Sequence, residues 1–334
     1  MPNVKPNWPL LAGMRIVLAL IVVFFHASEV FADGSARAWH AVGPIAAVAV
    51  FLVISGLCMA HSFQDRAEGF YRRRFWRIYP TFAVAMVLGT IPLVIWSPSA
   101  IMSTVHVAPP SPVSIAWAFA GFPGPNFGGH ELNGSLWSLF AEMRYYALVP
   151  LLFRLRGRYV AALILASCAA SFGVGAQYDY LTCAAFFWPF GLGWLVYRHW
   201  NDKGGNNQCV RALLLLLPPL MLIRDAAAGG TWGPALFVIC AALILAMERI
   251  RIPPKLAAML NYLGDLSFPV YAVHFALIWI LLLCRAPAAL LHPWPVALIA
   301  LAVSAAILHC IDRPLRRFGR ESLFRRPALE AAQV

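Results

Sequence analysis

Arg15 and His26 stand eleven residues apart in the first long apolar stretch of the sequence. On an α-helix, eleven steps of about 100° complete three turns plus about 20°, so both side chains would point the same way, about 16 Å apart along the axis. A guanidinium can bind an anion, and an imidazole can accept a proton or act as a nucleophile. Structural interpretations are also open: Arg15 as an anchor at the membrane surface, His26 in a helix–helix hydrogen bond. Their shared face favours the wall of a polar channel.

Two arginines in the run Phe70–Pro80, Arg74 and Arg77, are three positions apart. On a helix these side chains project together, which suits an anion such as a phosphate. The same run also fits a loop that binds anionic lipid.

Glu142 lies about two turns into the stretch that begins at Asn133, and Arg144 is close by. We expect this carboxylate to orient or charge-balance His26, as carboxylates do for catalytic imidazoles. A buried structural ion pair is the alternative. Because ionisable groups in a bilayer are costly, either interpretation gives Glu142 a definite role.

Ser267, Tyr271 and His274 are spaced by four and three residues, which stacks them on one helix face. His274 can equally be structural or functional. The sequence has no G-x-S-x-G, Walker A, G-x-G-x-x-G or H-E-x-x-H motif.

The elements that must position these residues are membrane spans. The 334 residues are 61% hydrophobic and 12% charged, against about 25% charged in soluble domains. We predict an all-α, polytopic transmembrane helix bundle of about ten spans, at 10–32, 43–63, 79–97, 134–153, 159–176, 181–198, 210–223, 233–248, 267–284 and 294–311. The short segment 112–123 is expected to be re-entrant or interfacial. The stretch 256–266 is expected to be a separate interfacial helix that leads into the ninth span.

Positive charge sets the predicted orientation. Of the 26 Lys and Arg residues, 22 fall on one side when the loops alternate, so both termini are predicted to be cytoplasmic. The same asymmetry explains the net charge of +12 without a nucleic-acid partner. Seven cysteines without C-x-x-C spacing argue against a disulfide framework and a zinc site, and we expect no metal.

The domain organisation is expected to be simple. The segment 10–32 is long, contains ionisable residues and lacks a small-residue cleavage site, so we interpret it as a retained span rather than a signal peptide. Residues 1–320 then form a single membrane-embedded domain, followed by a short cytoplasmic tail, 321–334, with no appended soluble domain.

Six segments, in order over almost the whole chain, resemble signatures of the acyltransferase-3 family of integral membrane O-acyltransferases. They are Leu10 to His26, Phe51-Leu-Val-Ile-Ser-Gly56, Arg74-Phe-Trp-Arg-Ile-Tyr-Pro80, Leu136-Trp-Ser-Leu139 with Glu142 and Tyr146, Leu263 to His274, and Ile311-Asp-Arg-Pro-Leu-Arg-Arg317. There are two departures. Met143 stands where many members carry a second acidic residue, and the residue before Gly13 is not acidic.

The resemblance implies transfer of an acyl group, usually acetyl, from cytoplasmic acetyl-CoA to a sugar hydroxyl of a bacterial exopolysaccharide or other surface glycan. It implies donor binding by Arg15, Arg74 and Arg77 and catalysis at His26, with Glu142 as the expected carboxylate partner. His26 would act as a general base or carry the acetyl group itself. Side chains that would contact the acceptor or complete a polar network are Asn133, Trp137, Ser267, Tyr271 and His274.

The expected setting is a multi-pass protein of the bacterial inner membrane, with acetyl-CoA, a carbohydrate acceptor, membrane lipids and glycan-assembly proteins as partners. Two alternatives stay open. Ten spans with buried charges also suit a transporter or flippase of a glycan or its precursor, and a non-catalytic lipid-binding or assembly subunit is the third hypothesis.

Overall fold

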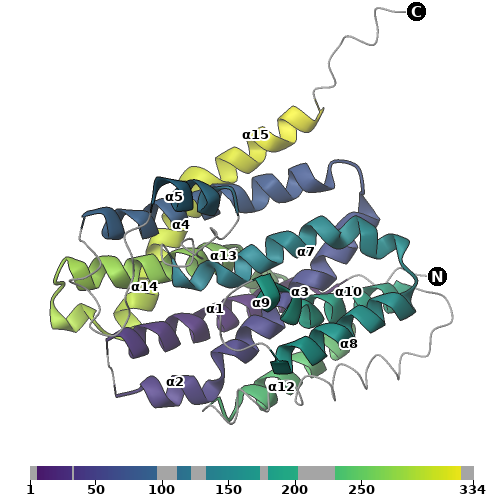
Figure 1. Ribbon diagram of the computed structural model, residues 1–334, viewed down its shortest axis with the longest axis horizontal. Coiled ribbons are helices and arrows are strands. Elements are labelled where there is room, and N and C mark those ends of the chain that lie inside the picture. The colour runs from purple at the N-terminus through teal and green to yellow at the C-terminus, as the bar shows by residue number, and fades with distance from the viewer. Residues whose placement is uncertain are drawn as a thin grey trace, which may run out of the picture.

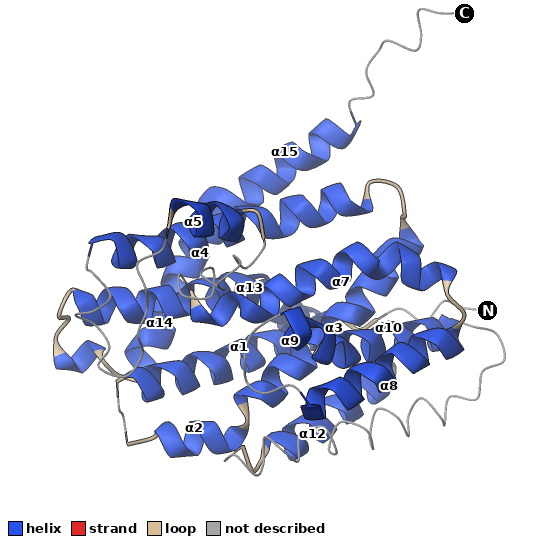
Figure 2. Ribbon diagram, viewed as in Figure 1, coloured by secondary structure: helices blue, strands red, loops and turns tan. Residues whose placement is uncertain are grey.

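The computed structural model describes residues 6–31, 34–95, 111–121, 133–173, 180–201 and 230–324. Within these ranges every regular element is a helix (Figure 2), which confirms the predicted all-α fold. Four helical segments of the described chain are long and apolar enough to cross a bilayer: Trp8–Val30, Ala36–Asp65, Pro254–Leu283 and Pro293–Gly319. The number of spans and the side on which the termini lie stay predictions.

Three predicted spans coincide with continuous helices, namely α1 (Trp8–Val30), α3 (Pro44–Asp65) and α8 (Gly157–Gly173). The span predicted at 79–97 begins nine residues earlier, as α4 (Phe70–Ile95), so the run Phe70–Pro80 is helical and not a loop. The predicted span 134–153 begins with a 3₁₀ turn, η2 (Gly134–Leu136), and continues as α7 (Trp137–Arg154). The span 181–198 is divided at Phe186 into α9 (Tyr180–Ala185) and α10 (Phe187–Asn201). The span 233–248 is α12 (Gly233–Ala246), and the span 210–223 lies outside the described residues.

Shorter elements complete the described chain. The segment 112–123 holds α5 (Pro112–Phe119), and α2 (Ala36–Val42) was not predicted. A 3₁₀ turn, η3 (Ala288–Leu290), precedes α14 (Pro293–Ile307). The last predicted span continues from α14 through a π-helical turn, η4 (Leu308–Asp312), into α15 (Arg313–Phe324).

The prediction of a separate interfacial helix at 256–266 is wrong. A single 30-residue helix, α13 (Pro254–Leu283), covers that stretch and the ninth span. Proline at its start is favourable, because the first N–H groups of a helix have no intrahelical partner. Pro269 does not break the helix, which packs against α1, α4 and α14. Neighbouring helices make an internal proline tolerable in membrane helices.

Two close helix crossings build the centre of the bundle. A Cβ on Gly264 of α13 would lie 2.4 Å from the Cβ of Ala12 on α1, and a Cβ on Gly193 of α10 would lie 1.9 Å from the carbonyl oxygen of Val53 on α3. Small residues let helix backbones approach in this way. In Figure 1, α1, α3 and α13 lie in the middle of the view, with α4 and α15 above them and α8, α10 and α12 below. The predicted site residues therefore come from the central helices α1 and α13 and from α4 and α7 beside them.

Candidate active site

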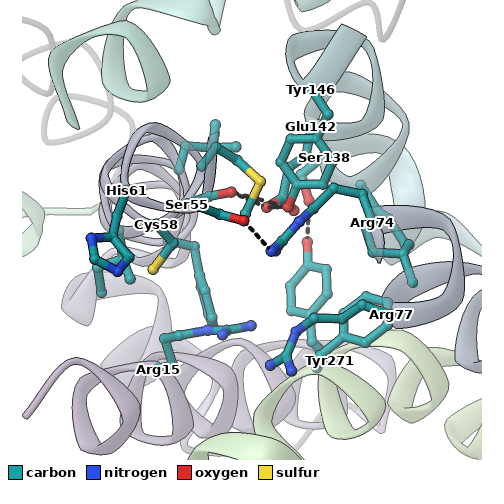
Figure 3. A pocket seen from close by; sticks show the side chains of 18 of the residues that line it. Arg15, Ser55, Cys58, His61, Arg74, Arg77, Ser138, Glu142, Tyr146 and Tyr271 are labelled. Carbon is teal, nitrogen blue, oxygen red and sulfur yellow. Dashed lines mark hydrogen bonds between the residues drawn. The ribbon is translucent and has the colours of Figure 1, made fainter. Parts of the chain in front are cut away.

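A cavity of about 410 Å³ opens between α1, α3, α4, α7 and α13 (Figure 3). Along α3 its lining extends from Val48 to Asp65, a distance of about 25 Å at 1.5 Å per residue. Asp65 is the last residue of α3, and the neighbouring lining residues of α4 lie in the first turns of that helix. At the other end Phe51 packs against Tyr271, with ring centroids 5.8 Å apart. The cavity is thus long and narrow, with one end among helix termini.

Arg15, Arg74 and Arg77 all line this cavity, from α1 and from the first two turns of α4. Figure 3 shows the three guanidinium groups on its walls. Arg74 donates from Nη2 to the Ser62 hydroxyl (2.7 Å), and its buried Nε has no hydrogen-bond partner. Arg77 lies 3.7 Å from the Asp265 carboxylate. Because these cations are so weakly compensated, the cavity favours an anionic ligand.

Arg15 is the least compensated of the three. No hydrogen bond or ion pair joins its guanidinium to another residue of the described chain. A half-buried guanidinium without a partner is costly, and a bound anion would remove that cost.

Glu142 lies on the α7 wall, where its carboxylate accepts hydrogen bonds from the hydroxyls of Ser55 and Tyr146. Those two hydroxyls are 3.1 Å apart. The carboxylate therefore ties α7 to α3 at the centre of the cavity (Figure 3). The expected direct pairing of Glu142 with His26 is not observed.

His26 instead contacts His274 of α13. The Nδ1 of His26 lies 2.9 Å from the Nε2 of His274, and the two rings are nearly parallel, 12° apart. The Nδ1 of His274 lies 2.8 Å from the carbonyl oxygen of Tyr271. His274 is fully buried, and His26 is partly exposed.

The hydrogen-bond chain determines which nitrogen of each ring carries the proton. The Tyr271 carbonyl can only accept, so Nδ1 of a neutral His274 carries the proton and its Nε2 is an acceptor. Nδ1 of His26 must then donate to His274. As a result, the lone pair of His26 is on Nε2, the nitrogen that does not face His274. An imidazole in this form can take a proton or attack a carbonyl carbon.

Tyr271 connects the histidine pair to the cavity. Its carbonyl accepts from His274, and its ring lines the cavity beside Ser138, with the two hydroxyl oxygens 2.6 Å apart. The Tyr271 hydroxyl also donates to the Ser135 carbonyl (2.9 Å). Asn133 donates to the carbonyl of Ala272 (2.8 Å), so the start of α7 is docked on the α13 backbone next to the histidines.

The remaining predicted residues lie outside this connection. The Ser267 hydroxyl donates to the Gly264 carbonyl of its own helix (2.6 Å) and is fully buried. The Trp137 ring packs edge-on against Phe186, with centroids 5.1 Å apart. Of the three residues predicted on one face of α13, Ser267 therefore bonds within its own helix, whereas Tyr271 and His274 belong to the site.

Three further side chains that were not predicted as site residues line the cavity, namely Ser55, Ser62 and Tyr146. A usable signal existed for the first two. Ser55, Cys58 and Ser62 recur at three and four residues on α3, so they share one helix face. Tyr146 is four residues after Glu142, which places its hydroxyl within reach of that carboxylate.

Taken together, the fold and the site define a helical membrane protein with a cation-lined cavity next to a histidine pair. The family model for the acyltransferase domain of the acyltransferase-3 type matches residues 9–311. The chain therefore belongs to the acyltransferase-3 family and is a membrane acyltransferase.

Two relatives agree with this membership. Acyltransferase MdmB of Streptomyces mycarofaciens is 28% identical in an alignment that covers 83% of this chain and 81% of the relative. Nodulation protein 10 of Rhizobium leguminosarum bv. viciae is 24% identical in an alignment that covers 46% of this chain and 48% of that protein. No solved structure matches the chain.

Proposed function

We propose that this acyltransferase moves an acetyl group from cytoplasmic acetyl-CoA to a sugar hydroxyl of a bacterial exopolysaccharide or other surface glycan, in the bacterial inner membrane. The observation that carries the proposal is the convergence of Arg15, Arg74 and Arg77 on a cavity that ends at Tyr271, the residue hydrogen-bonded to the histidine pair. A donor with phosphates at one end and a thioester at the other fits that arrangement of charges.

The arginines are the proposed donor site. Phosphate oxygens accept charge-assisted hydrogen bonds from guanidinium groups, which present several donors in a fixed plane. Arg15 and the Nε of Arg74 are without partners among the described residues, so they can take phosphate oxygens without giving up an existing bond. Arg77 would exchange its 3.7 Å contact with Asp265 for a phosphate.

His26 is the proposed transfer residue, in one of two ways. As a general base, its Nε2 takes the proton of the sugar hydroxyl while the hydroxyl oxygen bonds to the thioester carbon. The C–S bond then breaks, and the CoA thiolate receives the proton from His26. As a nucleophile, Nε2 itself bonds to the acetyl carbon, the C–S bond breaks and CoA leaves as its thiolate. The sugar hydroxyl oxygen then bonds to the acetyl carbon, the Nε2–C bond breaks, and the hydroxyl proton goes to the CoA thiolate. In both, the Nδ1–H of His26 stays bonded to His274, which holds the ring in place.

Glu142 has a positioning role in this proposal rather than a direct contact with His26. Its carboxylate holds the Ser55 and Tyr146 hydroxyls across the cavity and so fixes the wall along which the pantetheine arm would lie. A fixed wall limits the positions that the thioester can take, which is how orientation contributes to rate.

The experiment that tests the function compares cells with and without this protein. Mass spectrometry of their surface glycans should show O-acetyl groups on a sugar that depend on the intact chain and are lost in cells carrying His26→Ala. The matched control is His309→Ala, because His309 is exposed and contacts Tyr262 and Arg313 rather than the His26–His274 pair. Unchanged acetylation of every surface glycan in cells lacking the protein would reject the proposed acceptor class.

A further inference from the structure

One corner of the cavity is not used by the acyl-transfer chemistry. It is formed by Trp8, the first residue of α1, and by His61 and Asp65 in the last turns of α3. These three residues lie at the same end of the cavity as Arg74 and Arg77. Along α3, His61 and Asp65 are about 15 and 21 Å from the level of Phe51, which packs against Tyr271.

The corner is held in place by its neighbours. The Trp8 and His61 rings meet edge to face, with centroids 5.0 Å apart and planes at 62°. His61 is fixed from its other side by the Tyr197 hydroxyl, 3.2 Å from its Nδ1. Asn7, directly before Trp8, donates to the carbonyl oxygens of Met247 and Ile250 at 3.2 and 2.8 Å. Trp8 is still 39% exposed, so ring surface is available to a ligand.

Asp65 is unusual in this place. The cavity has three arginines, and a carboxylate near them opposes the binding of phosphates. No described arginine of the cavity forms an ion pair with Asp65. Its exposed carboxylate is therefore available as a hydrogen-bond acceptor.

The three side chains together match one chemical group. A purine has a flat π surface that stacks on aromatic rings, and adenine adds an exocyclic amino group that donates hydrogen bonds. Phosphates need neither feature, and the pantetheine arm has no aromatic ring. We propose that Trp8 and His61 bind the adenine ring of CoA by stacking and edge contacts, with Asp65 accepting from the 6-amino group. This inference rests on the proposed donor, CoA, and assigns a place to its adenine ring, which neither the arginines nor the wall around Glu142 would bind.

The test measures the binding of fragments to the full chain in lipid nanodiscs. The probes are CoA, adenosine 3′,5′-bisphosphate, 4′-phosphopantetheine and a CoA analogue with hypoxanthine in place of adenine. Trp8→Ala should weaken CoA and adenosine 3′,5′-bisphosphate about tenfold and 4′-phosphopantetheine by less than about twofold, because stacking acts on the base alone. Trp8→Phe should keep most of the affinity. The wild type should prefer CoA over the hypoxanthine analogue, and Asp65→Ala should remove that preference.

The control is Trp232→Ala, since Trp232 is 66% exposed and does not line the cavity. A tryptophan that only anchors the helix at the membrane surface would affect all probes alike. Equal losses for CoA and 4′-phosphopantetheine in Trp8→Ala, or no loss for CoA, would overturn the adenine site while leaving the donor in place. A wild-type chain that binds none of the probes would overturn the adenine site and the proposed donor together.

Discussion

At the scale of single residues, the hydrogen-bond chain from Tyr271 through His274 to His26 makes His274 a positioning residue. His274→Ala should lower kcat for acetyl transfer about 100-fold, because His26 loses the acceptor that keeps its Nδ1 protonated. KM for acetyl-CoA should stay unchanged. His274→Gln should recover part of the rate, because its amide oxygen can accept in place of Nε2. Steady-state kinetics of both variants decide this, and equal rates in the Ala and Gln variants would leave His274 with a packing role only.

Arg74 gives the second residue-scale prediction. Arg74→Ala should raise KM for acetyl-CoA about 10- to 100-fold, since hydrogen bonds to a charged group contribute about 1.5–3 kcal/mol. The rate with acetyl-pantetheine, which has no phosphate, should be unaffected. Arg158→Ala is the control, because Arg158 is exposed on α8 and outside the cavity. If both donors suffer equally, Arg74 supports the fold rather than the phosphates.

These residues also show what the sequence could and could not predict about the site. The spacing of Arg74 and Arg77 predicts that their side chains project together, and the structure brings both into one cavity with Arg15. The partner of His26 was not predictable in the same way. His274 is 248 residues away, and helix periodicity describes the faces of a helix without indicating which faces meet.

At the scale of elements, the close crossing of α3 and α10 holds the α3 wall on which Ser55 lies. Gly193→Ala would place a Cβ 1.9 Å from the Val53 carbonyl oxygen, so the helices must separate. We expect a loss of about 1–3 kcal/mol of stability from this overpacking, measured as a lower midpoint of thermal unfolding in detergent. In Gly157→Ala the nearest contact of the new Cβ is 3.9 Å, and its midpoint should match the wild type. Equal midpoints for both variants would show that the α3–α10 crossing is not tight.

Element boundaries were predicted less well than the existence of helices. Apolar length was enough to find α1, α3, α8 and α12. The continuity of α13 through Pro269 depends on the helices packed around it, which a hydropathy pattern does not contain. The division between α9 and α10 has a local cause, because Pro189 has no N–H to donate to the carbonyl of Ala185, the last residue of α9.

At the scale of the whole molecule, the cation-lined end of the cavity is proposed to face the cytoplasm, and His26 is proposed to lie toward the opposite side. The predicted orientation places Cys284, the last residue of the ninth span, at the outer side and Cys310, near the end of the tenth, at the inner side. Both are exposed free cysteines. A membrane-impermeant thiol reagent added to spheroplasts should label Cys284 and spare Cys310, and permeabilised membranes should label both. Labelling of Cys310 alone in intact spheroplasts would reverse the orientation.

The most direct measurement of the central claim is acetyl transfer from radiolabelled acetyl-CoA in inverted inner-membrane vesicles that contain either the wild-type chain, His26→Ala or His309→Ala. If His26 is the transfer residue, label should reach the glycan fraction with the wild type and His309→Ala, and transfer by His26→Ala should fall at least about 100-fold. Undiminished transfer by His26→Ala, in vesicles with equal amounts of folded protein, would contradict the assignment of His26.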